Sequence, residues 1–182
     1  MLQLKISGGE LFDEKTERFI LVKPQTLQLE HSLISVSKWE SKWKKPFMQK
    51  DPMTEEETMD YIRFMTISPQ NVDPMVYKFI NADHVRMVMD YIHDPMTATT
   101  INKQNKSQGP KQVITSELVY YYMTAYQIPF DPCQKWHFNR LMTLIEVCDA
   151  KQQKPKKMSQ AEINNRNRSR NAARKAKHGT KG

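Results

Sequence analysis

The spacing of hydrophobic residues changes about thirty residues into the chain. Before that point apolar and polar residues alternate in short runs at 2–6 (LQLKI) and 26–29 (TLQL), with an apolar run at 19–22 (FILV). A period of two places successive side chains on opposite faces, as in a β-strand. Gly8-Gly9 and residues 13–15 are typical of turns. We therefore predict two or three strands of a small antiparallel sheet within about residues 2–29.

From residue 31 onward the apolar residues recur at helical spacing. Leu33, Val36, Trp39 and Trp43 share one helix face, and Pro46 ends that run. Further helices are predicted after residues that cap an N-terminus, because their side chains accept hydrogen bonds from the free N–H groups of the first turn. These caps are the Thr54–Glu57 capping box, Asp73 before Pro74, Asn81 and Thr115.

The most apolar helix face is predicted near residue 140. A helix opened by Asp131-Pro132 would place His137, Leu141 and Cys148 on one side, together with Phe138, Leu144 and Ile145. Asp94-Pro95 is predicted to end the helix before it, and the polar stretch 97–111 is predicted to be an exposed loop. The pattern therefore indicates an α+β fold: a small N-terminal antiparallel β-hairpin or sheet, and then a mostly helical body made of helices within about 31–150.

Charge separates the last thirty-two residues from the rest. Residues 151–182 contain 11 of the 28 Lys and Arg but one acid, Glu162, whereas residues 1–150 carry a net charge of −2. We therefore predict a body at 1–150 and a basic tail at 151–182. A tail of this composition is typical of a segment that meets an acidic partner.

The basic tail contains its own helix signal. Ser159 and Glu162 form a capping box, and Arg166, Arg170 and Arg174 recur at a spacing of four, with Lys177 next on that face. Lys156 and Lys157 lie in the linker before it. Because Ile163 is the only large apolar residue of the predicted helix and its arginines repel one another, we expect a disordered segment or a marginal helix. Three interpretations stay open for these basic residues: nucleic-acid binding, recruitment of an acidic protein, and a solubilising tail.

Catalytic and metal-binding patterns are weak in this sequence. It has neither GxGxxG nor GxxxxGK[ST], and only five glycines. Cys133 and His137 are four residues apart, but a catalytic pair needs a third orienting group, and core packing explains both residues better. Cys148 would lie about four helical turns from Cys133, too far for a shared zinc ion or a disulfide. We expect no enzyme, no cofactor and no bound metal.

Two groups of apolar residues are candidates for a partner-binding surface. Met87, Met89 and Met96 belong to a Met-rich middle section, and flexible methionines adapt to varied apolar partners. Trp39, Trp43 and Phe47 form the second candidate. The alternative for both groups is packing in the core, which the general burial of Trp and Phe favours for the second.

Several strings of the chain resemble one group of bacteriophage proteins. They are 29–33 (LEHSL), 37–43 (SKWESKW), 45–47 (KPF), 94–100 (DPMTATT), 114–118 (ITSEL), 128–130 (IPF), 135–137 (KWH), 156–159 (KKMS) and 171–174 (NAAR). Together they span nearly the whole chain and resemble the tail assembly chaperones of tailed, siphovirus-type bacteriophages.

The resemblance implies a protein that acts by binding alone. Such a chaperone keeps the long helical tape-measure protein soluble in the host cytoplasm while tail-tube subunits polymerise around it. Neither the first ten residues nor any later stretch has the apolar run of a leader or a membrane span, so we expect no membrane association. The alternatives are a phage protein that binds nucleic acid through the basic tail, and a structural tail or neck component.

Overall fold

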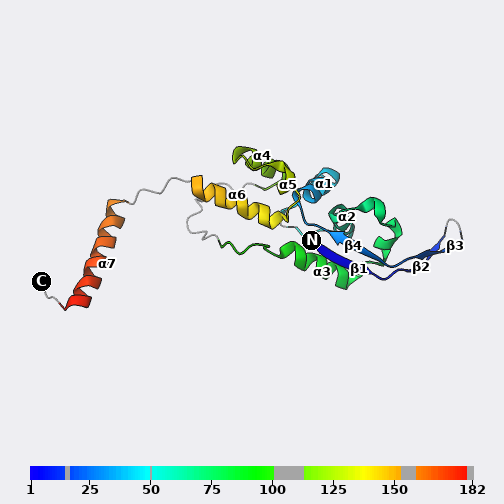
Figure 1. Cartoon of the computed structure of the whole chain (residues 1–182), viewed down its shortest axis with the longest axis horizontal. Helices are drawn as coiled ribbons and strands as arrows, with labels where there is room; N and C mark the ends of the chain where they lie inside the picture. The colour runs from blue at the N-terminus through cyan, green and yellow to red at the C-terminus, as the bar shows by residue number, and fades with distance from the viewer. Residues whose placement is uncertain (15–16, 50, 101–112, 153–158, 180–182) are drawn as a thin grey trace. The chain divides into compact units, whose positions relative to one another are not determined.

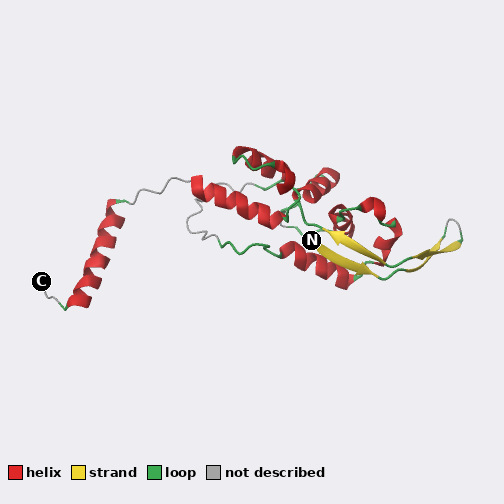
Figure 2. Cartoon of the chain, viewed as in Figure 1, coloured by secondary structure: helices red, strands yellow, loops and turns green. Residues whose placement is uncertain are grey.

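The chain forms two compact units, Met1–Cys148 and Asp149–Gly182, in the computed structural model. The structure describes residues 1–14, 17–49, 51–100, 113–152 and 159–179. The first unit begins with β-strands and continues with helices (Figures 1 and 2), which confirms the predicted α+β class.

The N-terminal strands form a two-stranded antiparallel ribbon with one interruption. In its inner half β1 (Leu2–Ile6) pairs with β4 (Gln25–Leu29). In its outer half β2 (Gly9–Asp13) pairs with β3 (Arg18–Val22), and we call these two strands the arm. The described residues thus contain four strands rather than two or three. The turn predicted at Gly8-Gly9 is wrong, because Gly9 begins β2. The turn predicted at 13–15 agrees with Glu14, which lies in a turn directly after β2, whereas residue 15 lies outside the described residues.

A close backbone approach marks the junction between the two halves. A Cβ atom on Gly8 would lie 1.8 Å from the carbonyl oxygen of Val22, and one on Gly9 would lie 2.5 Å from the ring of Phe79. Both distances are far below van der Waals contact, so neither position accepts a side chain without a shift of its surroundings. The two glycines therefore have a packing role here rather than the turn role that the sequence suggests.

The helices described before residue 153 are α1 (Leu33–Trp43), α2 (Glu55–Met65), η1 (Pro69–Asn71), η2 (Pro74–Phe79), α3 (Ala82–His93), α4 (Ser116–Ala125), α5 (Phe130–Cys133) and α6 (Phe138–Gln152), where η denotes a 3₁₀-helix. Four of them, α2, η2, α3 and α4, begin at a predicted cap. Thr54 Oγ1 accepts from the N–H of Glu57, and the Glu57 carboxylate accepts from the N–H of Thr54. Asp73, Asn81 and Thr115 also act as N-caps, and Asp94 ends α3, all as predicted.

The single long helix predicted from Asp131-Pro132 is wrong. Asp131 has non-helical backbone angles, α5 ends at Cys133, and α6 begins only at Phe138. The reason is a tertiary contact: the N–H of Phe138 donates to the carbonyl of His31 at 2.7 Å, and Ser32 and His137 form a β-bridge. A continuous helix would direct that N–H to the carbonyl four residues earlier.

The core lies between the inner half of the ribbon and the helices. Leu4, Ile6, Leu27 and Leu29 are at most 1% exposed on one face of β1 and β4. Packing partners that are at most 2% exposed come from α1, α2 and α6: Leu33, Val36, Trp39, Tyr61, Ile62, Met65, Phe138 and Leu141. Burial of one face of the ribbon and one stripe of each helix accounts for the fold of this unit.

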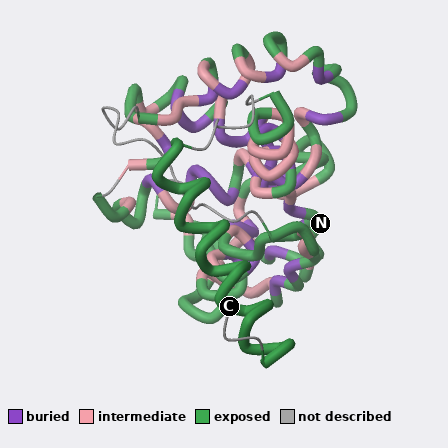
Figure 3. The backbone as a smooth tube through the Cα atoms, turned by 90° about the vertical axis from the view of Figure 1, so that its left-hand side faces the viewer, coloured by how far each residue is buried: buried purple, intermediate pink, exposed green. Residues whose placement is uncertain are grey.

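The second unit contains α7 (Gln160–His178), so of the two expectations for the basic tail the structure has the helix. Its predicted capping box is present, since the N–H of Ser159 donates to the Glu162 carboxylate at 2.7 Å and Glu162 N–H donates to Ser159 Oγ. Gly179 ends it in the left-handed conformation. Every residue from 159 to 179 is exposed (Figure 3). None of the described helices is both long and apolar enough to cross a membrane.

Candidate partner-binding surfaces

One group of ionisable residues resembles an active site, and it is buried where β4, α1, α2 and α6 meet. His31 Nδ1 lies 2.5 Å from the hydroxyl of Tyr61, and the rings of His31 and His137 are 5.0 Å apart. Burial lowers the pKa of His31 from 6.5 to about 3, and the electrostatic influence of His137 acts in the same direction. Burial also lowers the pKa of His137, whose Nε2 contacts the carbonyl of Tyr91 at 3.0 Å.

This histidine cluster (His31, His137, Tyr61 and Tyr91) holds elements together. His31 and Tyr61 are 2% exposed, so they offer no surface to a substrate. The hydroxyl of Tyr91 donates to the Glu30 carboxylate at 2.7 Å, which links α3 to the end of β4. Burial and this hydrogen bond raise the pKa of Tyr91. The neutral imidazoles are therefore consistent with packing and not with acid–base work at a surface.

The cysteines give no reactive or metal-binding cluster. Cys133 is buried in α5, Cys148 is half-buried in α6, and both are free thiols. His137 follows α5 and precedes α6, so it does not share a helix with Cys133. Across the part of the chain that the structure describes, no three His, Cys, Asp or Glu residues are grouped to hold a metal ion.

Two of the three residues of the candidate surface Trp39, Trp43 and Phe47 lie in the core, which is the alternative that the sequence favoured. Trp39 is 0% exposed and donates its indole N–H to the carbonyl of Glu57 at 2.9 Å. Phe47 is 8% exposed, with its ring centroid 4.4 Å from that of Tyr61. Trp43 is half-buried beneath the ammonium group of Lys42.

A buried carboxylate explains why this group points inward. Glu40 is 8% exposed and accepts from two backbone N–H groups, that of Phe47 at 2.8 Å and that of Ser116 at 2.7 Å. It draws the segment after α1 back onto the body and fixes the start of α4. The carboxylate has these hydrogen bonds in place of water, so its burial is compensated.

The predicted methionine surface is not continuous. Met87 is 45% exposed, Met96 is 37% exposed and Met89 is half-buried. Met87 and Met89 are two residues apart on α3, so they point about 160° apart around the helix axis. The three predicted methionines therefore remain partly accessible, but they do not share one face.

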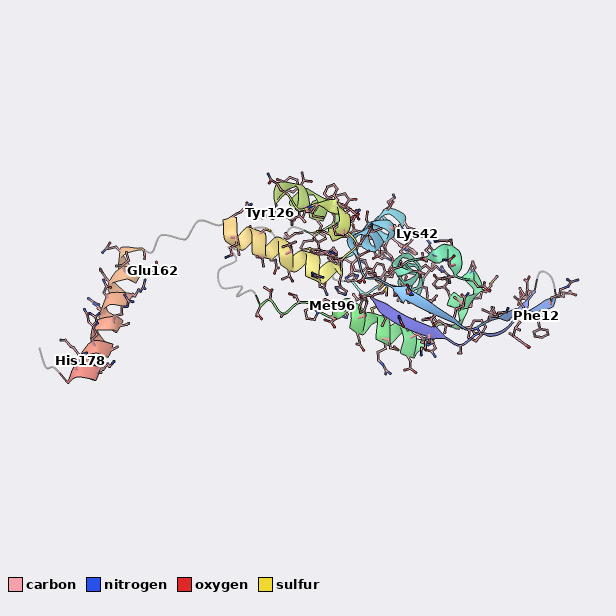
Figure 4. All side chains as sticks on the ribbon, in the orientation of Figure 1. Phe12, Lys42, Met96, Tyr126, Glu162 and His178 are labelled. Atoms are coloured by element: carbon pink, nitrogen blue, oxygen red, sulfur yellow. The ribbon has the colours of Figure 1, made fainter. Side chains whose placement is uncertain are left out.

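Three exposed apolar side chains lie together on the arm. On one face of β2 and β3, Phe12 is 53% exposed, Phe19 71% and Leu21 69%. The ring centroids of Phe12 and Phe19 lie 5.2 Å apart, in direct register across the strands. Figure 4 labels Phe12 on the part of the ribbon that extends beyond the helices. We call these three residues the arm face.

The opposite side of the arm packs against η2. Leu11 and Ile20, paired in register, are half-buried and contact the core. A depression of about 590 Å³ is lined by Leu11 and Ile20 together with Phe12, Asp13, Glu14, Met75 and Lys78. A second depression of about 370 Å³ lies between α2 and α3, with Met53, Met59, Ile80 and Val85 among its lining residues. Residues 75–85 thus contribute to both depressions, and three methionines line them.

The arm face is the functional candidate that sequence reasoning missed. The signal was present, because residues 11–12 and 19–22 place apolar side chains at consecutive positions. Consecutive apolar residues in a strand point to both faces. With only two strands and one supporting 3₁₀-helix, one of those faces has to remain open.

The predicted basic contacts divide between described and undescribed residues. Arg166, Arg170, Arg174 and Lys177 are exposed on α7. Lys156 and Lys157 lie outside the described residues, as does most of the predicted loop at 97–111.

Comparison with known proteins identifies no family for the chain. No family model, no curated protein and no solved structure matches the chain.

Proposed function

We propose that the chain is a non-enzymatic tail assembly chaperone of a tailed bacteriophage. It binds the tape-measure protein in the host cytoplasm while the tail tube, with which it also makes contact, assembles. The observation that carries this proposal is the arm face, where three large apolar side chains are each more than half exposed. The similarity of strings throughout the sequence to that group supports the phage context.

The chemistry of the arm face suits an amphipathic helical client. Phe12, Phe19 and Leu21 offer an apolar strip to the hydrophobic stripe of a helix. Glu10 lies on the same face, paired with Leu21, and Glu14 and Glu17 are exposed near the tip. These carboxylates favour a client whose apolar stripe is flanked by lysines or arginines, because opposite charges steer association.

The size of the apolar surface favours reversible binding. Three side chains and two shallow, methionine-lined depressions provide less area than the roughly 1,200–2,000 Å² of a stable complex. A chaperone has to release its client when the tail tube takes over, so weak contacts repeated along a long helical protein fit this role. Flexible methionines in the depressions would adapt to successive segments of such a client.

Co-expression with the tape-measure protein of the same phage tests the proposal. We expect the native chain to keep that protein in the soluble fraction, and the triple variant Phe12→Ser, Phe19→Ser, Leu21→Ser to lose at least about half of this effect. The control variant Ile67→Ser, Val113→Ser, Tyr121→Ser removes comparably exposed apolar residues elsewhere and should retain it.

Two results would contradict this function. One is a tape-measure protein that is equally soluble with and without the chain. The other is the presence of the chain in purified phage particles in fixed copy number, which would assign it to the tail or neck structure.

A further inference from the structure

The basic residues of α7 gather on one side of the helix. At 100° per residue, Arg166, Arg170, Arg174 and Lys177 fall within an arc of about 80° and extend over about 17 Å of helix. We call these four residues the basic face. Arg168 and Lys175 project from the opposite side, and Glu162 is engaged at the N-cap. Residues 159–179 therefore carry a net charge of +5, most of it on one face.

The rest of the surface of α7 argues against a protein partner. It consists mainly of Asn, Ser and Ala, with Ile163 as its one large apolar side chain and no aromatic residue among residues 159–179. Protein interfaces depend on an apolar centre with aromatic, Met or Arg anchors. Protein–DNA interfaces are more polar and far more positively charged. The composition of α7 matches the second kind.

We propose that α7 binds duplex DNA by lying in the major groove with its basic face toward the phosphates. A helix is about 10–12 Å in diameter with its side chains, and the major groove of B-form DNA is about 12 Å wide. The absence of aromatic residues disfavours single strands, which are held by stacking. The major groove of A-form RNA is too narrow to admit side chains.

Neighbouring residues fit the same groove. Asn167 and Asn171 lie beside the basic face, at about 100–140° on the same wheel. An Asn side chain can pair with the major-groove edge of adenine, whereas arginines bind phosphates and guanine. Ala172, Ala173 and Ala176 keep the helix slim. We expect affinity to come mainly from phosphate contacts, with modest sequence preference.

DNA binding also resolves an unfavourable feature of the isolated helix. Arg170 and Arg174 are spaced four apart and repel one another, and α7 has no buried side chain to offset that repulsion. Phosphates placed along the basic face replace the repulsion with attraction, so the helix gains stability when it binds. This activity depends on α7 alone and is independent of the proposed chaperone function.

The test uses the full chain and a fluorescently labelled duplex of about two helical turns, roughly 20 base pairs. We expect log affinity to fall linearly with log salt concentration, with a slope of about −3.6 for four phosphate contacts. In the variant Arg166→Ala, Arg170→Ala, Arg174→Ala the slope should shrink by about 2.7 and the affinity should drop at least about tenfold. Alanine favours helix, so this loss would not reflect unfolding of α7.

A charge-matched control separates local contacts from net charge. The variant Lys5→Ala, Lys23→Ala, Lys38→Ala removes three exposed lysines from the first unit and should leave the slope unchanged. Circular dichroism should show added helix when the duplex is mixed with the native chain and none with the α7 variant.

Three outcomes would overturn the proposal. They are a slope near zero, an equal loss of affinity in the control variant, and tighter binding to poly-glutamate than to the duplex. The last would assign α7 to an acidic protein partner instead.

Discussion

The two halves of the N-terminal ribbon are built from similar strands but treat their apolar residues differently. In the inner half, Leu4, Leu27 and Leu29 lie on one face and are fully buried, while polar residues occupy the other face. In the outer half, apolar residues occupy both faces, and Phe19 and Leu21 remain mostly exposed. The inner half thus belongs to the core, whereas folding leaves several apolar side chains of the outer half unburied.

This difference separates residues that stabilise the protein from residues available to a partner. Large exposed apolar side chains contribute little to folding, and a contiguous patch of them is typical of an interaction site. Buried side chains of the same type each contribute about 1.5–3 kcal/mol. The effects of the same substitution can therefore be compared at a buried and at an exposed position of the ribbon.

The largest expected effect contrasts two leucines of the ribbon. Leu27→Ala should lower the free energy of unfolding by about 3–4 kcal/mol, because it leaves a cavity in the core. Leu21→Ala, at a position 69% exposed, should change it by less than about 0.5 kcal/mol. Urea denaturation of both variants measures this difference. Similar losses in the two would show that the arm face is part of the stabilising core.

The second prediction concerns the junction between the halves. Gly8→Ala should cost about 2–3 kcal/mol, because the added methyl group would meet the backbone of Val22 and force the strands apart. The arm should then lose its packing against η2. Hydrogen exchange at β2 and β3 compared with β1 and β4 would measure this loss, and unchanged protection of the arm would contradict the role given to Gly8.

Acid should destabilise the core of the first unit, in which His31 is buried. The folded state keeps His31 neutral, with its pKa near 3, whereas the unfolded chain takes up the proton near pH 6.5. The free energy of unfolding should therefore have its full value above about pH 6.5 and should decrease as the pH drops toward 3. At pH 5 the decrease should be about 2 kcal/mol. His137 acts in the same direction.

A variant assigns this pH dependence to its source. His31→Phe removes the titrating group, so its stability curve between pH 6.5 and pH 4 should be flatter than that of the native chain, although its stability at pH 7 should be lower. Parallel curves for the two proteins would contradict the assignment to His31.

The smallest effect is expected in the second unit. Ser159→Ala removes the N-cap of α7 and should cost about 1 kcal/mol of helix stability. Because α7 buries no side chain, the melting temperature of the first unit should not change. Circular dichroism would report the loss of helix, and calorimetry would report the unchanged transition of the first unit. A shift of that transition would show that α7 supports the first unit.

Features governed by neighbouring residues were predictable from the sequence. The capping boxes at Thr54 and Ser159 and the caps at Asn81 and Thr115 each involve groups three residues apart. Such signals do not depend on the rest of the fold. The same holds for the alternation in β1 and β4, where one face is apolar.

Features governed by distant residues were not predictable. The inward turn of Phe47 depends on Glu40, whose carboxylate also binds the N–H of Ser116, 76 residues further along. The break before Phe138 depends on the carbonyl of His31, more than a hundred residues away. The apolar residues before and after this break happen to keep helical spacing, so the pattern alone indicated one continuous helix. The openness of the arm face likewise depends on how many elements pack around the ribbon.

Neighbouring residues on the two sides of the arm offer the most direct test of the central claim, that its open face serves a partner rather than the fold. Phe19→Ser and Ile20→Ser would be compared for unfolding by urea and for retention of co-expressed tape-measure protein on the tagged full chain. We predict that Phe19→Ser retains its stability within about 0.5 kcal/mol and loses most of the client, whereas Ile20→Ser loses about 1–2 kcal/mol and retains the client. Full client retention by Phe19→Ser, with a loss of stability equal to that of Ile20→Ser, would contradict the account.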